Sequence, residues 1–225
     1  FVIIDGSSYL YRAFYALPHL KNNIGSHTGA IFGVTSMINK LINDLSPKYI
    51  CAVFDAPGKN FRHRLYKEYK SNRKSMPQEL SEQVEPIFNF LKYMGIKIIQ
   101  QSDVEADDVI ASLVYKHSSK TKTLISSGDK DLAQLVDKNV QLINSLDGKQ
   151  LDQNDVKKKF GVAPNQIKDY LTLVGDASDN IPGVPKIGPK TAVTLLEKYH
   201  TLDSIIKNKD ELKKNKLSEK LEEIL

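Results

Sequence analysis

Short apolar strands alternate with amphipathic helical segments over residues 1–145, and this alternation constrains the fold more than any other feature of the sequence. Runs rich in β-branched residues predict strands over residues 1–5, 49–55, 96–100, 122–127 and 140–145. Apolar residues at helical spacing predict helices over residues 29–45, 78–94, 104–117 and 130–137. Strands separated by helices form a largely parallel sheet covered on both faces, so we predict an α/β fold.

The strand pattern stops near Lys157, and from there short helical patterns surround turns rich in glycine and proline. The sequence ends with the charged amphipathic stretch DELKKNKLSEKLEEIL. We place a domain boundary near residue 160, with an α/β domain over residues 1–160 and a small all-α subdomain over residues 161–225. Because the sequence starts within a predicted strand and stops within a predicted helix, we expect that it is trimmed and that the subdomain continues.

Cysteine, histidine and hydropathy limit the classes of protein that fit. The single cysteine, Cys51, lies in the apolar run YICAVF, which predicts a reduced core residue, excludes an internal disulfide framework and favours the cytoplasm. The five histidines show no zinc-type spacing, so a metal here should be a hard ion held by oxygen. We see no apolar run near the ~20 residues that cross a bilayer, and no signal peptide.

Acidic residues follow four of the predicted strands, and the carboxyl ends of parallel strands are where α/β sheets bind ligands. These acids are Asp5, Asp55, Glu105, Asp107, Asp108, Asp129 and Asp131. A separate pair, Asp176 and Asp179, lies in the motif GDASDN. Carboxylates that crowd together repel one another, and a divalent cation removes that cost. Oxygen ligands point to Mg²⁺ or Mn²⁺, and two such ions about 4 Å apart are typical of phosphodiester hydrolysis.

Helix capping is the alternative explanation for the acids of QSDVEADDVIASLV, residues 101–114. Ser102 and Glu105 have the spacing of a capping box, and acids in a first helical turn meet the positive end of the helix dipole. Capping and metal binding are compatible, because a helix N-terminus is a rigid mount for ligands.

Residues 61–76, FRHRLYKEYKSNRKSM, form a basic segment with interleaved aromatic residues. The basic residues are Arg62, Arg64, Lys67, Lys70, Arg73 and Lys74, and the aromatic residues are Phe61, Tyr66 and Tyr69. Cations for phosphates and rings for bases are typical of single-stranded nucleic-acid binding. The whole chain carries 32 basic and 27 acidic residues, and the nine acids above account for a third of the latter. A strongly basic body around an acidic pocket suits a polyanion, although a solvated helix face remains the alternative.

Residues 179–196, DNIPGVPKIGPKTAVTLL, predict a tight hairpin that leads into a helix N-terminus, where backbone N–H groups can hold a phosphate. The candidate contacts are Gly183, Lys186, Gly188, Lys190 and Thr191. The segment approaches the nucleotide-binding P-loop pattern, but Pro189 precedes Lys190 and no strand precedes the segment, so we reject ATP binding. A purely structural turn remains the alternative.

In their order along the chain, these segments resemble the 5′-nuclease family, which includes the 5′→3′ exonuclease domain of bacterial DNA polymerase I and the flap endonucleases. The matching stretches are VIIDGSSYLYRAFYA, TGAIFGV, VFDAPGKNFRHRLYKEYKSNR, VEADDVIASL, SSGDKDLAQLV and LVGDASDNIPGVPKIGPKTA, and the resemblance covers essentially the whole sequence. It implies a PIN-like or resolvase-like α/β domain with a mostly parallel central sheet, a helical arch at about residues 61–80 and a helix–hairpin–helix subdomain.

The resemblance also implies roles for residues that match the family's motifs. All nine acids match ligands of two Mg²⁺ ions, for which Mn²⁺ can substitute. Asp5, Asp55, Glu105 and Asp107 would serve mainly one ion, and Asp129, Asp131, Asp176 and Asp179 mainly the other. Tyr69, Lys70 and Arg73 match the YKxxR pattern of the arch, where the lysine and arginine face the scissile phosphate, and Arg12 matches another phosphate-contacting position. The hairpin matches an element that grips duplex DNA and often binds K⁺ through backbone carbonyls.

The implied reaction is hydrolysis of a phosphodiester at or near a 5′ end, which leaves a 5′-phosphate and a 3′-hydroxyl. The implied substrates are 5′ flaps, nicked duplexes and RNA primers on DNA, processed in replication and repair by a monomer that is free-standing or linked to polymerase domains. One rival is a phosphatase that forms an aspartyl-phosphate on Asp5, but Ser7 stands where that chemistry needs a second aspartate. The other rival is a DNA-binding relative with an inactive metal site, and the complete set of acids argues against it.

Overall fold

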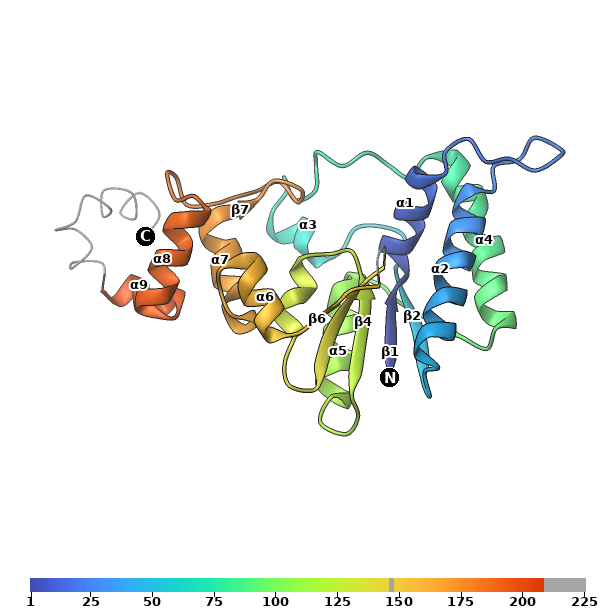
Figure 1. The fold of residues 1–225 in the computed structure, drawn as a ribbon. Coiled ribbons are helices and arrows are strands. Elements are labelled where there is room, and N and C mark those ends of the chain that lie inside the picture. The colour runs from blue at the N-terminus through green and yellow to red at the C-terminus, as the bar shows by residue number, and fades with distance from the viewer. Residues whose placement is uncertain (146–147, 209–225) are drawn as a thin grey trace. The chain divides into compact units, whose positions relative to one another are not determined.

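The computed structural model describes residues 1–145 and 148–208, and by its internal contacts the chain divides into two compact units (Figure 1). The first unit comprises residues 1–61 and 75–152. The second comprises residues 62–74, which are most of the basic segment, and the chain from residue 153 onward. The amphipathic stretch expected at residues 210–225 lies outside the described residues.

A six-stranded sheet in the order β3-β2-β1-β4-β5-β6 forms the centre of the first unit. Its strands are β1 (Val2–Asp5), β2 (Ile50–Asp55), β3 (Lys97–Gln101), β4 (Thr123–Ser127), β5 (Val140–Asn144) and β6 (Gln150–Leu151). The first five strands are parallel, as predicted, and β6 pairs with β5 in the antiparallel sense. The sequence did not predict β6, because two residues are too few to show a periodicity. Strand order reverses between β1 and β4, which makes the carboxyl ends of these two strands the topological switch point of the sheet.

Helices cover both faces of this sheet, as predicted. On one face, α1 (Gly6–Ala16), α2 (Gly29–Leu45) and α4 (Gln78–Tyr93) pack against one another. On the other face, α5 (Ala106–His117) packs against β1, β2, β3 and β4. The predicted helix at residues 130–137 is a single 3₁₀ stretch, η1 (Asp131–Leu135). Among the described helices, none combines the length and the apolar character that a membrane crossing requires.

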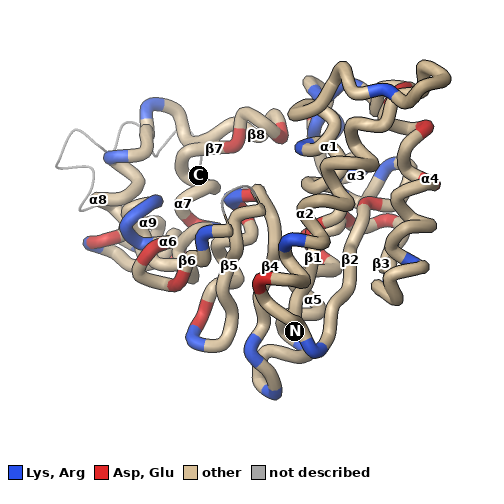
Figure 2. The backbone as a smooth tube through the Cα atoms, turned by 45° about the vertical axis from the view of Figure 1, so that its right-hand side comes forward, with Lys and Arg blue, Asp and Glu red and all other residues tan. Residues whose placement is uncertain are grey.

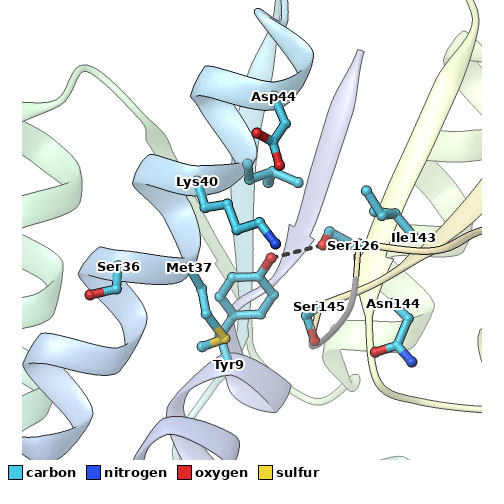
Figure 3. A pocket seen from close by; sticks show the side chains of 11 residues that line it. Tyr9, Ser36, Met37, Lys40, Asp44, Ser126, Ile143, Asn144 and Ser145 are labelled. Atoms are coloured by element: carbon cyan, nitrogen blue, oxygen red, sulfur yellow. Dashed lines mark hydrogen bonds between the residues drawn. The ribbon is translucent and has the colours of Figure 1, made fainter.

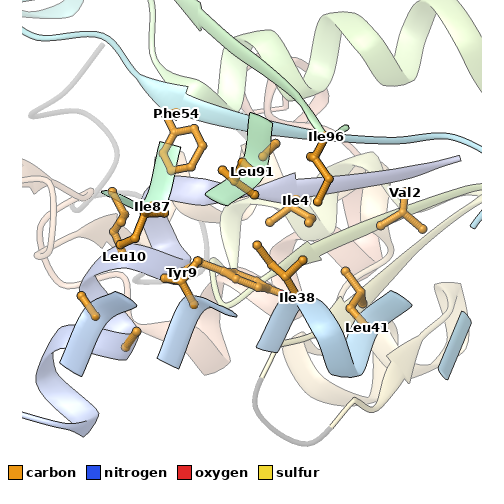
Figure 4. Packing of buried hydrophobic residues seen from close by; sticks show 14 of the residues in the cluster. Val2, Ile4, Tyr9, Leu10, Ile38, Leu41, Phe54, Ile87, Leu91 and Ile96 are labelled. Carbon is orange, nitrogen blue, oxygen red and sulfur yellow. The ribbon is translucent and has the colours of Figure 1, made fainter. Parts of the chain in front are cut away.

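The main hydrophobic core lies between the sheet and the α1, α2 and α4 layer (Figure 4). Ile4 from β1, Ile38 from α2 and Leu91 from α4 are each at most 1% exposed. Burial of one such side chain contributes roughly 1.5–3 kcal/mol, so this layer holds β1 and its carboxyl end in place. Cys51 is a free cysteine buried in β2, as expected for a core residue, and burial raises the pKa of its thiol to about 12.

Two helix starts differ from the sequence expectation, and both involve acids of interest. Asp5, the last residue of β1, is also the N-cap of α1, which begins at the next residue. The periodicity of the sequence did not reveal α1, because the helix begins at Gly6, directly after the last residue of β1, with no connecting turn between them. The capping box of α5 pairs Glu105 as N-cap with Asp108, whereas Ser102 was the predicted N-cap. The helix starts later because Asp103 adopts a left-handed φ of 71°, which helical geometry excludes.

The second unit is largely helical. Its elements are α3 (Phe61–Leu65), α6 (Gln153–Phe160), η2 (Pro164–Gln166), α7 (Ile167–Val174), β7 (Gly175–Asp176), β8 (Ile181–Pro182), α8 (Pro189–Tyr199) and α9 (Leu202–Lys207). The short helices were predicted, but the antiparallel β7–β8 ladder was not. This ladder needs glycine, because a Cβ on Gly183 would lie 2.3 Å from the backbone of Val174. In the predicted arch, helix is confined to α3 and the start of α4, with turns over residues 67–73.

Candidate metal centre

Asp5 lies at the switch point of the sheet and is 4% exposed. Its Oδ1 accepts a hydrogen bond from the backbone N–H of Ser8 over 2.9 Å, and its Oδ2 accepts one from Ser127 Oγ over 2.5 Å. Burial raises the pKa of Asp5 to about 6, although both hydrogen bonds lower it. Repulsion from Asp129 and Asp55 adds to the increase. Asp5 is therefore a desolvated carboxyl group within electrostatic reach of acids from two other segments.

Asp107, in the first turn of α5, shows the same effect more strongly. Its pKa is raised to about 8, first by burial and then by four acidic neighbours. These neighbours are Asp129, Asp5, Asp55 and Glu105. Five of the predicted ligands, which come from β1, β2, the start of α5 and the turn after β4, thus interact electrostatically at one edge of the sheet.

Hydrogen bonds at the start of α5 fix three further acids. Asp55 Oδ1 accepts from the backbone N–H of Ala106 over 2.8 Å, so the end of β2 is tied to the first turn of the helix. Asp108 Oδ2 accepts from the backbone N–H of Glu105 over 2.9 Å. Asn60 Nδ2 donates to Glu105 Oε1 over 2.7 Å within a buried contact. The capping function predicted for this segment is confirmed, with Glu105 and Asp108 as the pair.

Asp129 and Asp131 lie in a tight turn after β4. The backbone N–H of Asp129 donates to Ser127 Oγ over 2.9 Å, and the backbone N–H of Asp131 donates to Asp129 Oδ1 over 2.8 Å. Ser127 Oγ, which donates to Asp5, is therefore also the hydrogen-bond partner of this turn.

The donor set fits a hard divalent cation in its chemistry. All of the contributing side chains are carboxylates, and the charges that act on Asp107 all repel it, so a dication would relieve an existing cost. Within residues 1–145 and 148–208, however, no three such side chains already stand together as a finished cage.

In the second unit, the acid Asp179 is paired with basic side chains. Asp179 Oδ1 forms an ion pair with Arg73 Nη2, and Asp179 Oδ2 lies 3.7 Å from Lys70 Nζ and accepts from Tyr69 OH over 3.0 Å. Asp176 is 7% exposed, and its Oδ1 accepts from the backbone N–H of Ser178 over 2.9 Å and from Ser178 Oγ over 2.6 Å. Lys70 and Arg73, predicted to face a phosphate, thus lie with Tyr69 of the same pattern around an acid of their own unit.

The backbone in this region supports the same arrangement. Lys70 adopts a left-handed φ of 53°, which is uncommon for a lysine, and its N–H donates to the carbonyl of Asp179 over 2.9 Å. Asn72 Nδ2 donates to the carbonyl of Ala177 over 2.9 Å, and Asn180 Nδ2 donates to the carbonyl of Glu68 over 2.8 Å. The basic segment and the GDASDN turn therefore form one hydrogen-bonded body (Figure 2 marks their charges along the backbone).

Arg12, the phosphate-contacting candidate of α1, is held in the first unit. Its Nη1 donates to Asn144 Oδ1 over 3.5 Å and also to Ser145 Oγ. A Cβ on Gly128 would come within 2.5 Å of the guanidinium, so the guanidinium lies close to the backbone at this glycine. Arg12 thus lies over the turn that carries Asp129.

The remaining predicted contacts lie in α3, after it, and in the hairpin. Arg62 is in α3, and Lys74 is exposed beyond it. Gly188 is the N-cap of α8, Pro189 is its first residue, and Lys190 and Thr191 follow in the first turn. Gly183 and Lys186, the latter with a left-handed φ of 65°, lie in the connection between α7 and α8. Binding of K⁺ here stays a prediction.

Sequence reasoning missed the neutral side chains that orient the acids, chiefly Ser127, Asn60 and Ser7. Ser7 Oγ accepts from the backbone N–H of Asp55 over 2.9 Å. The only signal in the sequence was their position. Ser7 and Ser127 are each two residues from a candidate acid, and Asn60 lies in the loop that follows Asp55.

Models of two protein families together match the whole chain. The first, described as the 5′-3′ exonuclease N-terminal resolvase-like domain, matches residues 1–161, and the second, the 5′-3′ exonuclease C-terminal SAM fold, matches residues 162–225. The chain is 44% identical to a 5′-3′ exonuclease of Buchnera aphidicola, over 95% of this chain and 71% of that protein. It is 48% identical to DNA polymerase I of Pseudomonas aeruginosa, over 87% of this chain and 22% of that protein.

Solved structures share the fold at lower sequence identity. The T5 D15 protein co-crystallized with metal ions matches with a TM-score of 0.72 at 22% identity, over 92% of this chain and 77% of that one. The catalytic core of Rad2 in complex with DNA substrate matches with a TM-score of 0.64 at 18% identity, over 98% of this chain and 70% of that one.

Proposed function

This chain belongs to the 5′-3′ exonuclease family, and on that premise we propose that it is a metal-dependent, structure-specific 5′ nuclease that hydrolyses DNA phosphodiesters at or near 5′ ends. Its substrates would be 5′ flaps, nicked duplexes and RNA primers on DNA, the intermediates of replication and repair. Relatives that are DNA polymerases I support a role beside a polymerase, whether or not one is attached to this chain. We propose that it acts as a monomer in the bacterial cytoplasm.

The observation that carries the proposal is the mutual repulsion of acids gathered at the carboxyl edge of the sheet, of which Asp5 and Glu105 are buried. Asp107 feels four acidic neighbours, and burial together with those neighbours raises its pKa to about 8. Gathering such charges costs free energy, and a bound cation would offset that cost. Divalent ions bound there would activate the attacking water and neutralise charge on the phosphate.

The roles of individual residues follow from where each is held. Asp5, Asp55, Glu105 and Asp107 would hold mainly one Mg²⁺ ion, and Mn²⁺ could replace Mg²⁺. Asp129 and Asp131, with Asp176 and Asp179, would hold mainly the second. Asp108, which also caps the first turn of α5, would complete the ligand set. Most of these carboxylates accept a hydrogen bond from a backbone N–H or a neutral side chain, which sets their direction before substrate arrives.

Cations of the chain would grip the substrate. Arg12 would contact a phosphate beside the acids of its unit. Lys70 and Arg73 would face the scissile phosphate, and because Asp179 now neutralises them, substrate would have to compete with that ion pair. Arg62, Tyr69 and Lys74 would guide the single strand, while the hairpin with Lys186 and Lys190 would hold duplex DNA through backbone N–H groups and a K⁺ ion.

The test is cleavage of a 5′-labelled flap duplex with Mg²⁺, with Ca²⁺ and with EDTA, beside a blunt duplex of the same sequence. We expect Mg²⁺-dependent cutting near the junction and no cutting in EDTA. Asp107→Asn should abolish it, whereas Glu85→Gln, the same change on an exposed part of α4, should cut normally.

Binding of the flap without cutting in any metal would overturn the nuclease proposal in favour of a DNA-binding relative with an inactive site. Equal cutting in EDTA would instead reject the metal dependence.

A further inference from the structure

A single buried hydroxyl connects three of the acids proposed as metal ligands. Ser127 Oγ, at the end of β4, donates to Asp5 Oδ2 over 2.5 Å and accepts from the backbone N–H of Asp129 over 2.9 Å. Asp129 Oδ1 accepts from the N–H of Asp131 over 2.8 Å. We infer that Ser127 is a positioning residue of the metal centre, which sets the direction of Asp5 and of the Asp129–Asp131 turn before an ion binds.

The chemistry of the hydroxyl fixes the direction of both bonds. A backbone N–H can only donate, so the serine oxygen must act as the acceptor toward Asp129. The one hydroxyl proton is then left for Asp5, whose carboxylate can only accept. While Asp5 is ionised, the backbone N–H of Asp129 therefore donates to the hydroxyl and the hydroxyl donates to the carboxylate, which is the one arrangement that satisfies both neighbours of Ser127.

The place of this relay in the sheet explains why it matters. β1 and β4 are adjacent strands, with Ile4 paired to Ser126, so Asp5 and Ser127 are the next residues in register. They lie where the strand order reverses and where ligand-bearing segments diverge. Without the hydroxyl, Asp5 Oδ2 would lose its donor inside a buried site, and the turn that carries Asp129 would lose its anchor on β4.

The inference rests on the proposed function, because it assumes that these acids bind a divalent ion. Groups that orient metal ligands typically affect metal affinity or activity by about 10–100-fold when they are removed. We expect an effect of that size for Ser127→Ala on metal affinity.

Ser126 offers a matched control within the same strand. It is 0% exposed, and its hydroxyl is hydrogen-bonded to Tyr9 OH over 2.8 Å, so its side chain lies on the opposite face of the sheet (Figure 3). There it lines a cavity of about 180 Å³ together with Lys40 and Asp44 of α2. Ser126→Ala thus deletes a buried, hydrogen-bonded hydroxyl one residue away, and that hydroxyl is hydrogen-bonded to Tyr9 rather than to a proposed metal ligand.

The experiment measures Mn²⁺ binding to the DNA-free protein by isothermal titration calorimetry, for the wild type, Ser127→Ala, Ser127→Thr and Ser126→Ala. Ser127→Ala should weaken binding by about 10–100-fold. Ser127→Thr keeps the hydroxyl and should recover most of the affinity, and Ser126→Ala should match the wild type. If Ser127→Ala does not fold, as judged by circular dichroism, Ser127→Cys replaces it, because a thiol keeps the volume but is a weak donor.

Equal Mn²⁺ affinity in the wild type and in the folded Ser127 variant would overturn the positioning role while leaving the proposed nuclease intact. An equal loss in Ser126→Ala would also overturn it, because the effect would then come from general loosening of β4. Absence of Mn²⁺ binding in the wild type would instead overturn the metal centre on which the inference rests.

Discussion

The acids of the two units meet opposite electrostatic surroundings. In the first unit, Asp107 is surrounded by four acids, and its pKa rises to about 8 through burial and their repulsion. In the second unit, Asp179 is paired with Arg73 and Lys70 and bonded by Tyr69 OH. Where the chain provides its own cations, the acid organises a turn. Where the charges around a largely desolvated acid all repel it, the arrangement calls for a cation from outside, whereas an ion at Asp179 would first have to compete with Arg73 and Lys70.

The largest expected effect comes from deletion of first-unit acids. Asp108→Ala or Asp129→Ala should abolish flap cleavage, a loss of at least about 10³-fold, because a metal-dependent reaction loses its charge stabilisation. Single-turnover cleavage measures the loss, and fluorescence anisotropy in Ca²⁺ should show that DNA binding is largely retained.

Glu85→Gln serves as the control for the removal of a charge from an exposed position. If Asp108→Ala or Asp129→Ala fails to fold, the acid has a structural role, and the contrast between the units disappears at that residue.

A smaller effect is expected when the second unit loses a cation. Arg73→Ala removes the proposed phosphate contact and also leaves Asp179 without its closest cation. We expect about tenfold weaker DNA binding and a salt dependence reduced by roughly one unit of slope. Titrations at several salt concentrations measure both quantities.

Lys97→Ala, at the exposed start of β3, removes one positive charge elsewhere and should leave the slope unchanged. An unchanged slope in Arg73→Ala would mean that the arginine only holds the turn through Asp179.

The sequence predicted the parallel sheet well because its strands are apolar runs separated by clear helical patterns, and all five of those strands are confirmed within a residue or two. It predicted the family from motifs that span the chain, and the two family models agree. It did not predict α1, which begins directly after β1 with no turn between them. It also did not predict the β7–β8 ladder, in which only two residue pairs form. Such features depend on tertiary contacts rather than on periodicity.

The candidate site was predictable only in part for the same reason. Acids at strand ends can be read from the sequence, because the parallel sheet sends all carboxyl ends to one edge. The partners of those acids cannot, because Ser127 reaches Asp5 from a strand more than a hundred residues away. Likewise, nothing in the sequence separates the repelled acids from Asp179, whose cations lie in a distant segment.

A third prediction concerns the stability of the metal-free protein. The pKa of Asp107 is about 8 in the folded state, above the ordinary value of 3.8, so folding favours its protonated form. Its stabilising contribution is complete below about pH 4 and is lost as the pH rises through 8. In EDTA, the melting temperature should therefore fall between pH 5 and pH 8 by several degrees more in the wild type than in Asp107→Asn.

Added Mn²⁺ should remove most of that difference, because the ion offsets the repulsion that destabilises the folded state. Identical pH dependence in the wild type and Asp107→Asn would contradict the proposed charge repulsion, and Glu85→Gln should follow the wild type.

The smallest expected effect tests how much the hydrogen bond from Tyr69 OH to Asp179 stabilises the basic segment. Tyr69 is 4% exposed, and Tyr69→Phe removes only the hydroxyl that donates to Asp179. A hydrogen bond to a charged group is worth about 1.5–3 kcal/mol, so hydrogen exchange in the basic segment should accelerate by roughly 10–100-fold. Tyr115→Phe, on a side chain that is 91% exposed, should change nothing. In the DNA-free protein the acceleration should be the same with and without Mn²⁺, since the chain's own cations already neutralise Asp179. A strong suppression by Mn²⁺ would mean that the ion displaces those cations before substrate binds.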